Sequence, residues 1–200
     1  MVQEMAKKTA EKMSDHSVIE SKAIHIYAYG LELLYSSLAG VVVLVIISVV
    51  CGKPYLWIPY LLGFALLRLS GGGYHAITHF RCVFIFSLLY SLVLLIESVC
   101  AIPVKIYLVT CLGNLVIILL FSPVAAPNKP LKESQGKTNR RNSLILGIAN
   151  LLGYIVLVFL FNVHNQWVNM YIVGSSMAGL SMLLAVINKR ERRRLHENNG

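Results

Sequence analysis

The chain has 200 residues, of which 56% are hydrophobic and 14% charged, and its mean hydropathy is +0.67. A water-soluble domain of this size needs a more polar surface, so the composition indicates a protein of the lipid bilayer. Eighteen basic residues stand against nine acidic ones, which gives a formal net charge of +9. So few acidic residues argue against a nucleic-acid-binding protein with a mixed charged surface.

The first element in chain order is a polar stretch over residues 1–30. It carries four lysines, several acidic residues and the apolar side chains of Val18, Ile19, Ile24 and Ile26. This mixture predicts a cytoplasmic helix that lies along the membrane surface.

Six apolar runs follow, at about 31–51, 54–67, 82–102, 104–121, 144–161 and 166–187. All except the second approach the ~20 residues that a helix needs to cross ~30 Å of hydrocarbon. The second run, which ends before Arg68, either spans a thinned bilayer or enters only partly and returns as a re-entrant piece. The sequence therefore predicts an all-α, polytopic membrane protein with about six transmembrane segments.

The basic residues predict the orientation of these segments. If all six runs cross the membrane, sixteen of the eighteen bases share one side with both termini, and Lys53 and Lys105 remain on the other. The positive-inside rule makes the crowded side cytoplasmic. The predicted organisation is an interfacial helix over 1–30, a membrane domain over 31–187 and a basic cytoplasmic tail over 188–200, which is expected to bind anionic lipid.

The first polar interruption is Arg68-Leu-Ser-Gly-Gly-Gly-Tyr-His75-Ala-Ile-Thr-His79-Phe-Arg-Cys82. The glycines allow a turn or a close approach of another chain. A cysteine is a nucleophile as its thiolate, and a neighbouring imidazole can take its proton. The segment therefore predicts either a cysteine nucleophile, Cys82, with a histidine as its base, or polar histidines at the membrane interface beside a Cys82 that is buried in lipid.

The spacing leaves the identity of that base open. On one continuous helix His75 and Cys82 are separated by a rise of ~10 Å, which is too far for a hydrogen bond. Either the helix begins after His75 and the glycine turn folds His75 back over Cys82, or His75 meets Cys82 of a second subunit. His79, three residues before Cys82, is the direct helical neighbour and the rival base.

The second interruption, 123–143, has three prolines, Gly136 and five bases, which predicts a loop and not a further helix.

Among the polar residues of the apolar runs, Asn114 and Asn150 are candidates to join helices by hydrogen bonds. Glu97 is expected to face the external side and to be hydrated. Glu32 is expected on the cytoplasmic side, where it could orient an imidazole or pair with Arg68.

Neither a disulfide scaffold nor a metal or other cofactor is expected. The four cysteines, Cys51, Cys82, Cys100 and Cys111, have no paired or metal-like spacing. His75 and His79 are four residues apart, but Ala76 stands where an intramembrane metalloprotease has its glutamate, and no third ligand is evident.

Three motifs together resemble a known family. They are Tyr29-Gly-Leu-Glu32, Arg68-x-x-x-Gly72-Gly73-Tyr-His75-Ala followed by Cys82, and Ser122-Pro-Val-Ala-Ala-Pro-Asn-Lys-Pro-Leu131. With the length and the order of the motifs, they resemble the accessory gene regulator protein B family of bacterial quorum-sensing peptidases over essentially the whole chain.

The resemblance implies a cysteine endopeptidase of the bacterial cell membrane, with its active site on the cytoplasmic side. Its substrate is a propeptide with an amphipathic leader and an acidic C-terminal tail. Cys82 cleaves off the tail with His75, rather than His79, as base and then acid, and the signal segment stays on Cys82 as a thioester. A substrate thiol or hydroxyl then closes a thiolactone or lactone, and family members act as homodimers.

Further residues are expected to support this reaction. Arg68, Gly72, Gly73 and Glu32 are the supporting candidates, with the glycine-turn amides or Arg68 as oxyanion donors. The cytoplasmic bases offer a surface for the acidic tail, although lipid anchoring explains them equally well; the candidates are Lys129, Lys132, Arg140 and Arg141.

Two other functions fit parts of the sequence. A small transporter or channel would line its path with Glu32, Glu97, His75 and Arg68. A purely structural protein would use its basic loops as a docking platform for a partner.

Overall fold

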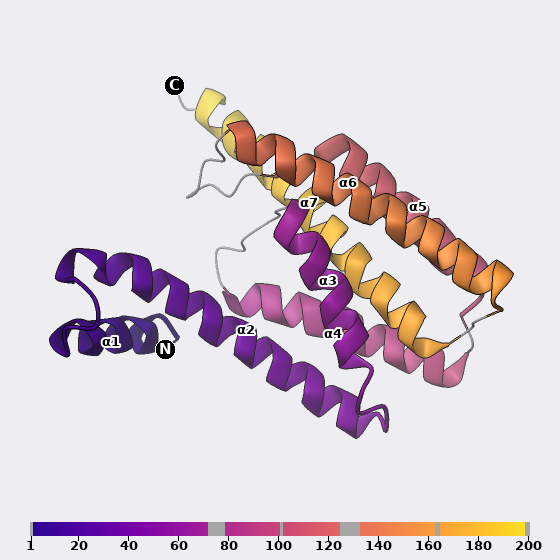
Figure 1. The fold of residues 1–200 in the computed structure, drawn as a ribbon, viewed down its shortest axis with the longest axis horizontal. Helices are drawn as coiled ribbons and strands as arrows, with labels where there is room; N and C mark the ends of the chain where they lie inside the picture. Colours follow the sequence, from indigo (N-terminus) through magenta and orange to yellow (C-terminus); the bar gives the residue numbers. More distant parts are fainter. Residues whose placement is uncertain (1, 72–78, 101, 125–132, 163–164, 199–200) are drawn as a thin grey trace.

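The protein is built from helices that pack side by side (Figure 1). The computed structural model describes residues 2–71, 79–100, 102–124, 133–162 and 165–198, with side chains except at 79–82, 133 and 188–198. These residues form no sheet, as an all-α fold predicts. The helices are α1 (Val2–Asp15), α2 (Ile24–Val50, after a 3-10 turn at Ser21–Ala23), α3 (Trp57–Gly71), α4 (His79–Val99), α5 (Val104–Phe121), α6 (Glu133–Ile155, continued by a π-helical turn at Val156–Leu160) and α7 (Gln166–Asn198).

Each of the six predicted apolar runs corresponds to one of the helices α2 to α7. Four stretches are long and apolar enough to cross a membrane, namely Ser21–Val50, Val104–Phe121, Ser134–Leu160 and Gln166–Ile187. The apolar helices Trp57–Gly71 and Val83–Val99 are shorter. At 15 residues α3 is about 22 Å long, less than the thickness of the hydrocarbon layer.

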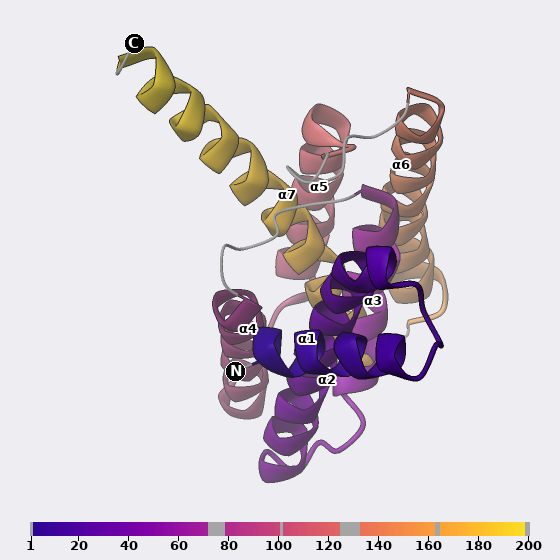
Figure 2. The ribbon, with the colours of Figure 1, turned by 90° about the vertical axis from the view of Figure 1, so that its left-hand side faces the viewer.

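Successive helices run in opposite directions. Figures 1 and 2 show α2, α4 and α6 running one way and α3, α5 and α7 the other. As a result, the end of α3, the start of α4, the end of α5 and the start of α6 lie toward the same end of the bundle. These are the helix ends that adjoin the two polar interruptions of the sequence.

The closest packing in the bundle joins α3 to α7. A Cβ atom added at Gly63 would lie 2.9 Å from the amide nitrogen of Ser175, and one added at Gly174 would meet the backbone of Tyr60. Glycine at these two positions lets the helix backbones touch, as small residues do between membrane helices. The short helix α3 is therefore held against α7 along its length.

Side-chain hydrogen bonds join α5, α6 and α7 in the interior. The amide groups of Asn114 and Asn150 donate to the buried hydroxyl of Ser175, at 3.1 and 2.8 Å. The hydroxyl of Tyr171 donates to Asn150 Oδ1 at 2.9 Å. Both asparagines therefore join helices, as the sequence predicts.

An aromatic cluster packs α4 against α3. The ring of Phe86 lies 4.7 Å from that of Tyr60 and 4.5 Å from that of Phe64, measured between centroids. The Tyr60 hydroxyl donates to the Phe86 carbonyl at 2.9 Å, and Tyr90 lies 4.8 Å from Tyr60. Tyr90 also hydrogen-bonds Ser48 of α2, so α4 is fixed on two neighbours.

The single surface helix expected over residues 1–30 is wrong. The helix α1 ends at Asp15, the chain reverses near Ser17 with a φ of 57°, and residues 24–30 already belong to α2. The helix α1 packs on α2 through the buried residues Ala6 and Ala10, whereas Val18 and Ile26 are exposed. The small side chains of Ala6 and Ala10 allow α1 and α2 to approach closely, while the lysines of α1 are exposed.

The loop expected over 123–143 is wrong from residue 133 onward. The helix α6 begins at Glu133, so ten polar residues extend it beyond its apolar part. The last proline of the stretch is Pro130, and nothing after it forbids a helix. The basic residues after 188 likewise continue α7 as a helix to Asn198.

Candidate functional site

The predicted nucleophile lies at the start of α4. Cys82 is the fourth residue of this helix, which begins at His79. His75, Gly72 and Gly73 lie outside the described residues, so their roles stay predictions.

The end of α3, just before the glycine turn, is fixed by side chains of α7. Arg68 Nη1 donates to Ser181 Oγ at 2.7 Å, and the guanidinium carbon lies 6.0 Å from the centre of the Phe64 ring. Ser181 in turn donates to the carbonyl of Ala178 at 2.7 Å. Arg68 thus joins α3 to α7 next to the predicted turn.

The two polar interruptions of the sequence meet at a backbone hydrogen bond. The amide of Val124, just after α5, donates to the carbonyl of Gly71, the last residue of α3, at 3.0 Å. The motif that leads to His75 and the motif that begins at Ser122 are therefore neighbours in space. This contact links two segments that are about fifty residues apart in the chain.

A buried pair of serines fixes the second motif on α6. The hydroxyls of Ser122 and Ser143 are 2.6 Å apart, and the side chain of Ser143 also donates to the carbonyl of Arg140 at 3.0 Å. Beneath the junction lies a small apolar cluster of residues from α3, α5 and α7: Leu67, Ile118, Ala178 and Met182.

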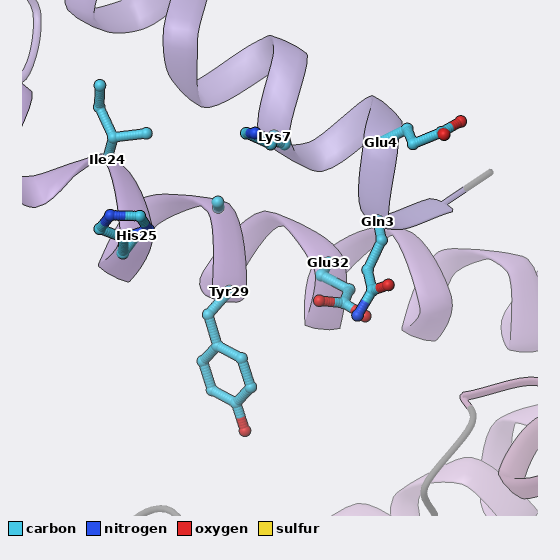
Figure 3. Close-up of a pocket in the computed structure, with 8 residues that line it drawn as sticks. Gln3, Glu4, Lys7, Ile24, His25, Tyr29 and Glu32 are labelled. Atoms are coloured by element: carbon cyan, nitrogen blue, oxygen red, sulfur yellow. The ribbon is translucent and has the colours of Figure 1, made fainter.

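Glu32 lies elsewhere, in a pocket of about 380 Å³ between α1 and α2. Figure 3 shows the Gln3 side chain reaching from α1 toward the Glu32 carboxylate, with Lys7 further along α1. His25 and Tyr29 of α2 also line this pocket. Glu32 is thus placed at a different helix pair from Arg68, whose guanidinium binds α7.

A family model, described as Accessory gene regulator B, matches residues 6–185. The chain belongs to this family. Membership and the apolar helices make it a membrane protein that takes part in quorum-sensing peptide processing, with a propeptide as the kind of substrate this family acts on. No curated protein and no solved structure is significantly similar to the chain.

In this member of the accessory gene regulator B family, Glu97 is not simply hydrated, which corrects the expectation from sequence. Its Oε1 atom accepts hydrogen bonds from the Tyr107 hydroxyl and from Asn169 Nδ2, the latter at 3.3 Å. Its Oε2 atom is buried without a hydrogen-bond partner. The carboxylate therefore ties the end of α4 to the first turns of α5 and α7.

Two of the four basic residues predicted to bind the acidic tail lie within the described part of the chain. Arg140 and Arg141 are exposed near the start of α6, whereas Lys129 and Lys132 lie outside the described residues. Within the described part of the chain, no three His, Cys, Asp or Glu side chains are grouped so that they could hold a metal ion.

Glu32, Arg68 and Glu97 lie at three different helix interfaces, an arrangement that does not favour a shared transport path.

Three serines fix the helices around the hydrogen bond between Gly71 and Val124, and sequence reasoning did not identify them as site residues: Ser122, Ser143 and Ser181. The position of Ser122, directly after an apolar run and before Pro123, is a signal for the end of a helix. Ser143 and Ser181 carry no such signal, because serine is common on every face of membrane helices.

Proposed function

We propose that the protein is a membrane cysteine endopeptidase that removes the acidic tail of a quorum-sensing propeptide and cyclises the remainder. The Cys82 sulfur attacks the peptide carbonyl carbon before the tail, and the carbon–nitrogen bond breaks. His75 takes the thiol proton and gives it to the leaving amine. A thiol or hydroxyl of the signal segment then attacks the thioester, the bond to Cys82 breaks, and the proton returns to the enzyme.

The observation that carries this proposal is the junction between Gly71 and Val124, because it brings together the two motifs that the family resemblance rests on. The carbonyl of Gly71 immediately precedes Gly72, from which the chain continues to His75. The described part of α4 starts at His79, and the segment that joins it to Gly71 contains His75. The position of Cys82 in the first turn of α4 also helps, because the positive end of a helix favours a thiolate.

The packing of α4 supports a dyad within one subunit. Positions 82, 86 and 90 recur at intervals of four and share one face of α4. Phe86 and Tyr90 of this face pack against Tyr60 of α3. Position 82 is therefore on the side of α4 that faces the helix leading to His75.

We further propose six crossings with both termini in the cytoplasm. The alternating helix directions support this arrangement (Figure 1), and with six crossings the sequence assigns sixteen of the eighteen bases to one side, which the positive-inside rule makes cytoplasmic. The short helix α3 crosses by packing on α7, with Arg68 at the cytoplasmic boundary. The active site then lies at the inner face of the bacterial cell membrane.

The acidic tail of the substrate is proposed to bind basic residues that follow Val124 in the sequence, which are Lys129, Lys132, Arg140 and Arg141. The exposed guanidinium groups of Arg140 and Arg141 stand on the polar extension of α6, one turn or less from Ser143. The more distal bases of α7 are proposed to contact anionic lipid. The protein is proposed to act as a homodimer.

Co-expression with its propeptide tests the proposal. Cys82→Ala and Cys82→Ser should abolish tail removal while the protein still inserts, and wild-type protein should yield a peptide thioester on Cys82 by mass spectrometry. Full cleavage by Cys82→Ala would refute the assignment. Mixing Cys82→Ala with His75→Ala subunits, each inactive alone, should not restore activity, and recovery would show that the dyad forms between subunits.

A further inference from the structure

The last helical carbonyls of α3 need hydrogen-bond partners from outside the helix. The final four carbonyl groups of any α-helix have no partner within it. For Gly71 this partner is the amide of Val124, at 3.0 Å, and Val124 lies only three residues after the end of α5. The position of α3's end therefore depends on how the chain leaves α5.

Ser122 determines that exit. It ends α5 with an extended backbone, φ −78° and ψ 142°, and its amide still bonds Ile118 of the last turn. Ser122 is 6% exposed, and Ser143, whose hydroxyl lies beside it, is 0% exposed. A buried hydroxyl without a partner is unfavourable, and the Ser122 hydroxyl finds its partner in Ser143 of α6, which fixes the point where the chain leaves α5.

The direction of these hydrogen bonds follows from counting protons. A serine hydroxyl has one proton, and that of Ser143 is donated to the Arg140 carbonyl at 3.0 Å. Ser122 must therefore donate to Ser143 Oγ across the 2.6 Å between them. The hydrogen bond between Ser122 and Ser143 and the hydrogen bond between Val124 and Gly71 are joined by the covalent backbone through Pro123, and together they connect α6 to the end of α3.

We propose that Ser122 and Ser143 are positioning residues for the catalytic dyad. They act through Val124 on Gly71, which His75 follows by four residues in the sequence. The inference rests on the proposed function. A displacement of about 1 Å in a catalytic group lowers the rate by up to about a hundredfold, so loss of this link should appear in kcat.

The test uses full-length protein in lipid vesicles. Mass spectrometry follows the rate at which iodoacetamide alkylates Cys82 as a function of pH, and propeptide cleavage gives kcat and KM. Wild-type Cys82 should react at lower pH than Cys82 of His75→Ala. Ser122→Ala should move the pH profile toward that of His75→Ala and lower kcat about ten- to a hundredfold, with KM changed less than about twofold. Ser122→Thr, which keeps the hydroxyl, should retain both.

Ser175→Ala is the matched control. It removes a serine that is 1% exposed and bonded to Asn114 and Asn150, but it lies away from the junction. It should lower thermal stability and leave the pH profile of Cys82 as in the wild type. If Ser122→Ala does not insert, Ser143→Ala breaks the same link from α6.

The outcomes separate the two levels of the argument. If wild type and His75→Ala differ but Ser122→Ala and Ser143→Ala retain the wild-type profile and kcat, the positioning role is overturned. The same holds if Ser175→Ala shifts the profile as much as Ser122→Ala. If wild type and His75→Ala share one profile, the dyad itself, and with it the proposed function, is overturned.

Discussion

Replacing Gly63 by alanine should push α3 away from α7. The added Cβ would lie 2.9 Å from the Ser175 amide nitrogen and 3.0 Å from the Tyr171 carbonyl carbon, and closer still to the Tyr171 carbonyl oxygen. These atoms belong to the backbone of α7, which cannot rotate aside as a side chain can. Ordinary contact begins at 3.4 Å, and the Tyr171 carbonyl oxygen, as the nearest atom, requires the helices to separate by more than about 1 Å.

The size of the effect follows from two opposing terms. Overpacking costs about 1–3 kcal/mol, while alanine in place of glycine favours a helix by up to about 1 kcal/mol. We expect Gly63→Ala to lower the free energy of unfolding by about 1–2 kcal/mol. Because α3 ends at Gly71, we also expect slower propeptide cleavage.

Denaturant unfolding in detergent and propeptide cleavage in vesicles measure the two effects. The matched control is Gly153→Ala in α6, where an added Cβ meets nothing within 4 Å. That variant should be as stable as the wild type or more so, with normal cleavage. If Gly63→Ala behaves like Gly153→Ala in both assays, the close contact between α3 and α7 does not exist as described.

Three further predictions concern single side chains. His75→Ala should lower kcat by about 10²–10⁴-fold and His79→Ala by only a few-fold, measured by propeptide cleavage; the reverse ranking would make His79 the base. Replacing both Arg140 and Arg141 by glutamine should raise KM, weaken its dependence on salt and leave kcat unchanged, and an unchanged KM at low salt would refute tail binding there. Glu97→Ala should destabilise the protein in detergent by about 1–3 kcal/mol, and Glu97→Gln by less, because the amide oxygen still accepts hydrogen bonds; equal losses would contradict this.

Hydropathy predicted the apolar parts of the helices α2 to α7 but not their full lengths. It detects the apolar part of a helix, and α2 and α6 both extend into polar sequence. The polar start of α6 at Glu133 has the composition of a loop, because lysine, glutamine and asparagine are common both in loops and in the exposed ends of helices. The direction of α3 through the bundle depends on glycine contacts with α7, which no local pattern reveals.

The candidate site divides in the same way. The candidates His75 and Cys82, which follow three glycines, could be proposed from residue types, because a cysteine nucleophile needs a base. The hydrogen bond between Val124 and Gly71 could not, because it depends on where two distant helices end. The role of Glu97 was misjudged because its partners come from helices that sequence spacing does not bring together.

The distribution of polarity in the bundle has a consequence for how the sequence can change. Its interior holds the buried polar residues Ser48, Asn114 and Ser175, while leucines and valines such as Leu92, Val109 and Leu120 cover its outside. The familiar guide for soluble proteins, which protects large apolar residues and tolerates change at polar ones, therefore still holds for buried apolar residues such as Leu44 and Met182 but fails for the exposed apolar residues and the buried polar ones. Mutational tolerance should be greatest among the exposed apolar positions, and the exchange of a buried serine for leucine should be one of the most damaging substitutions in the chain.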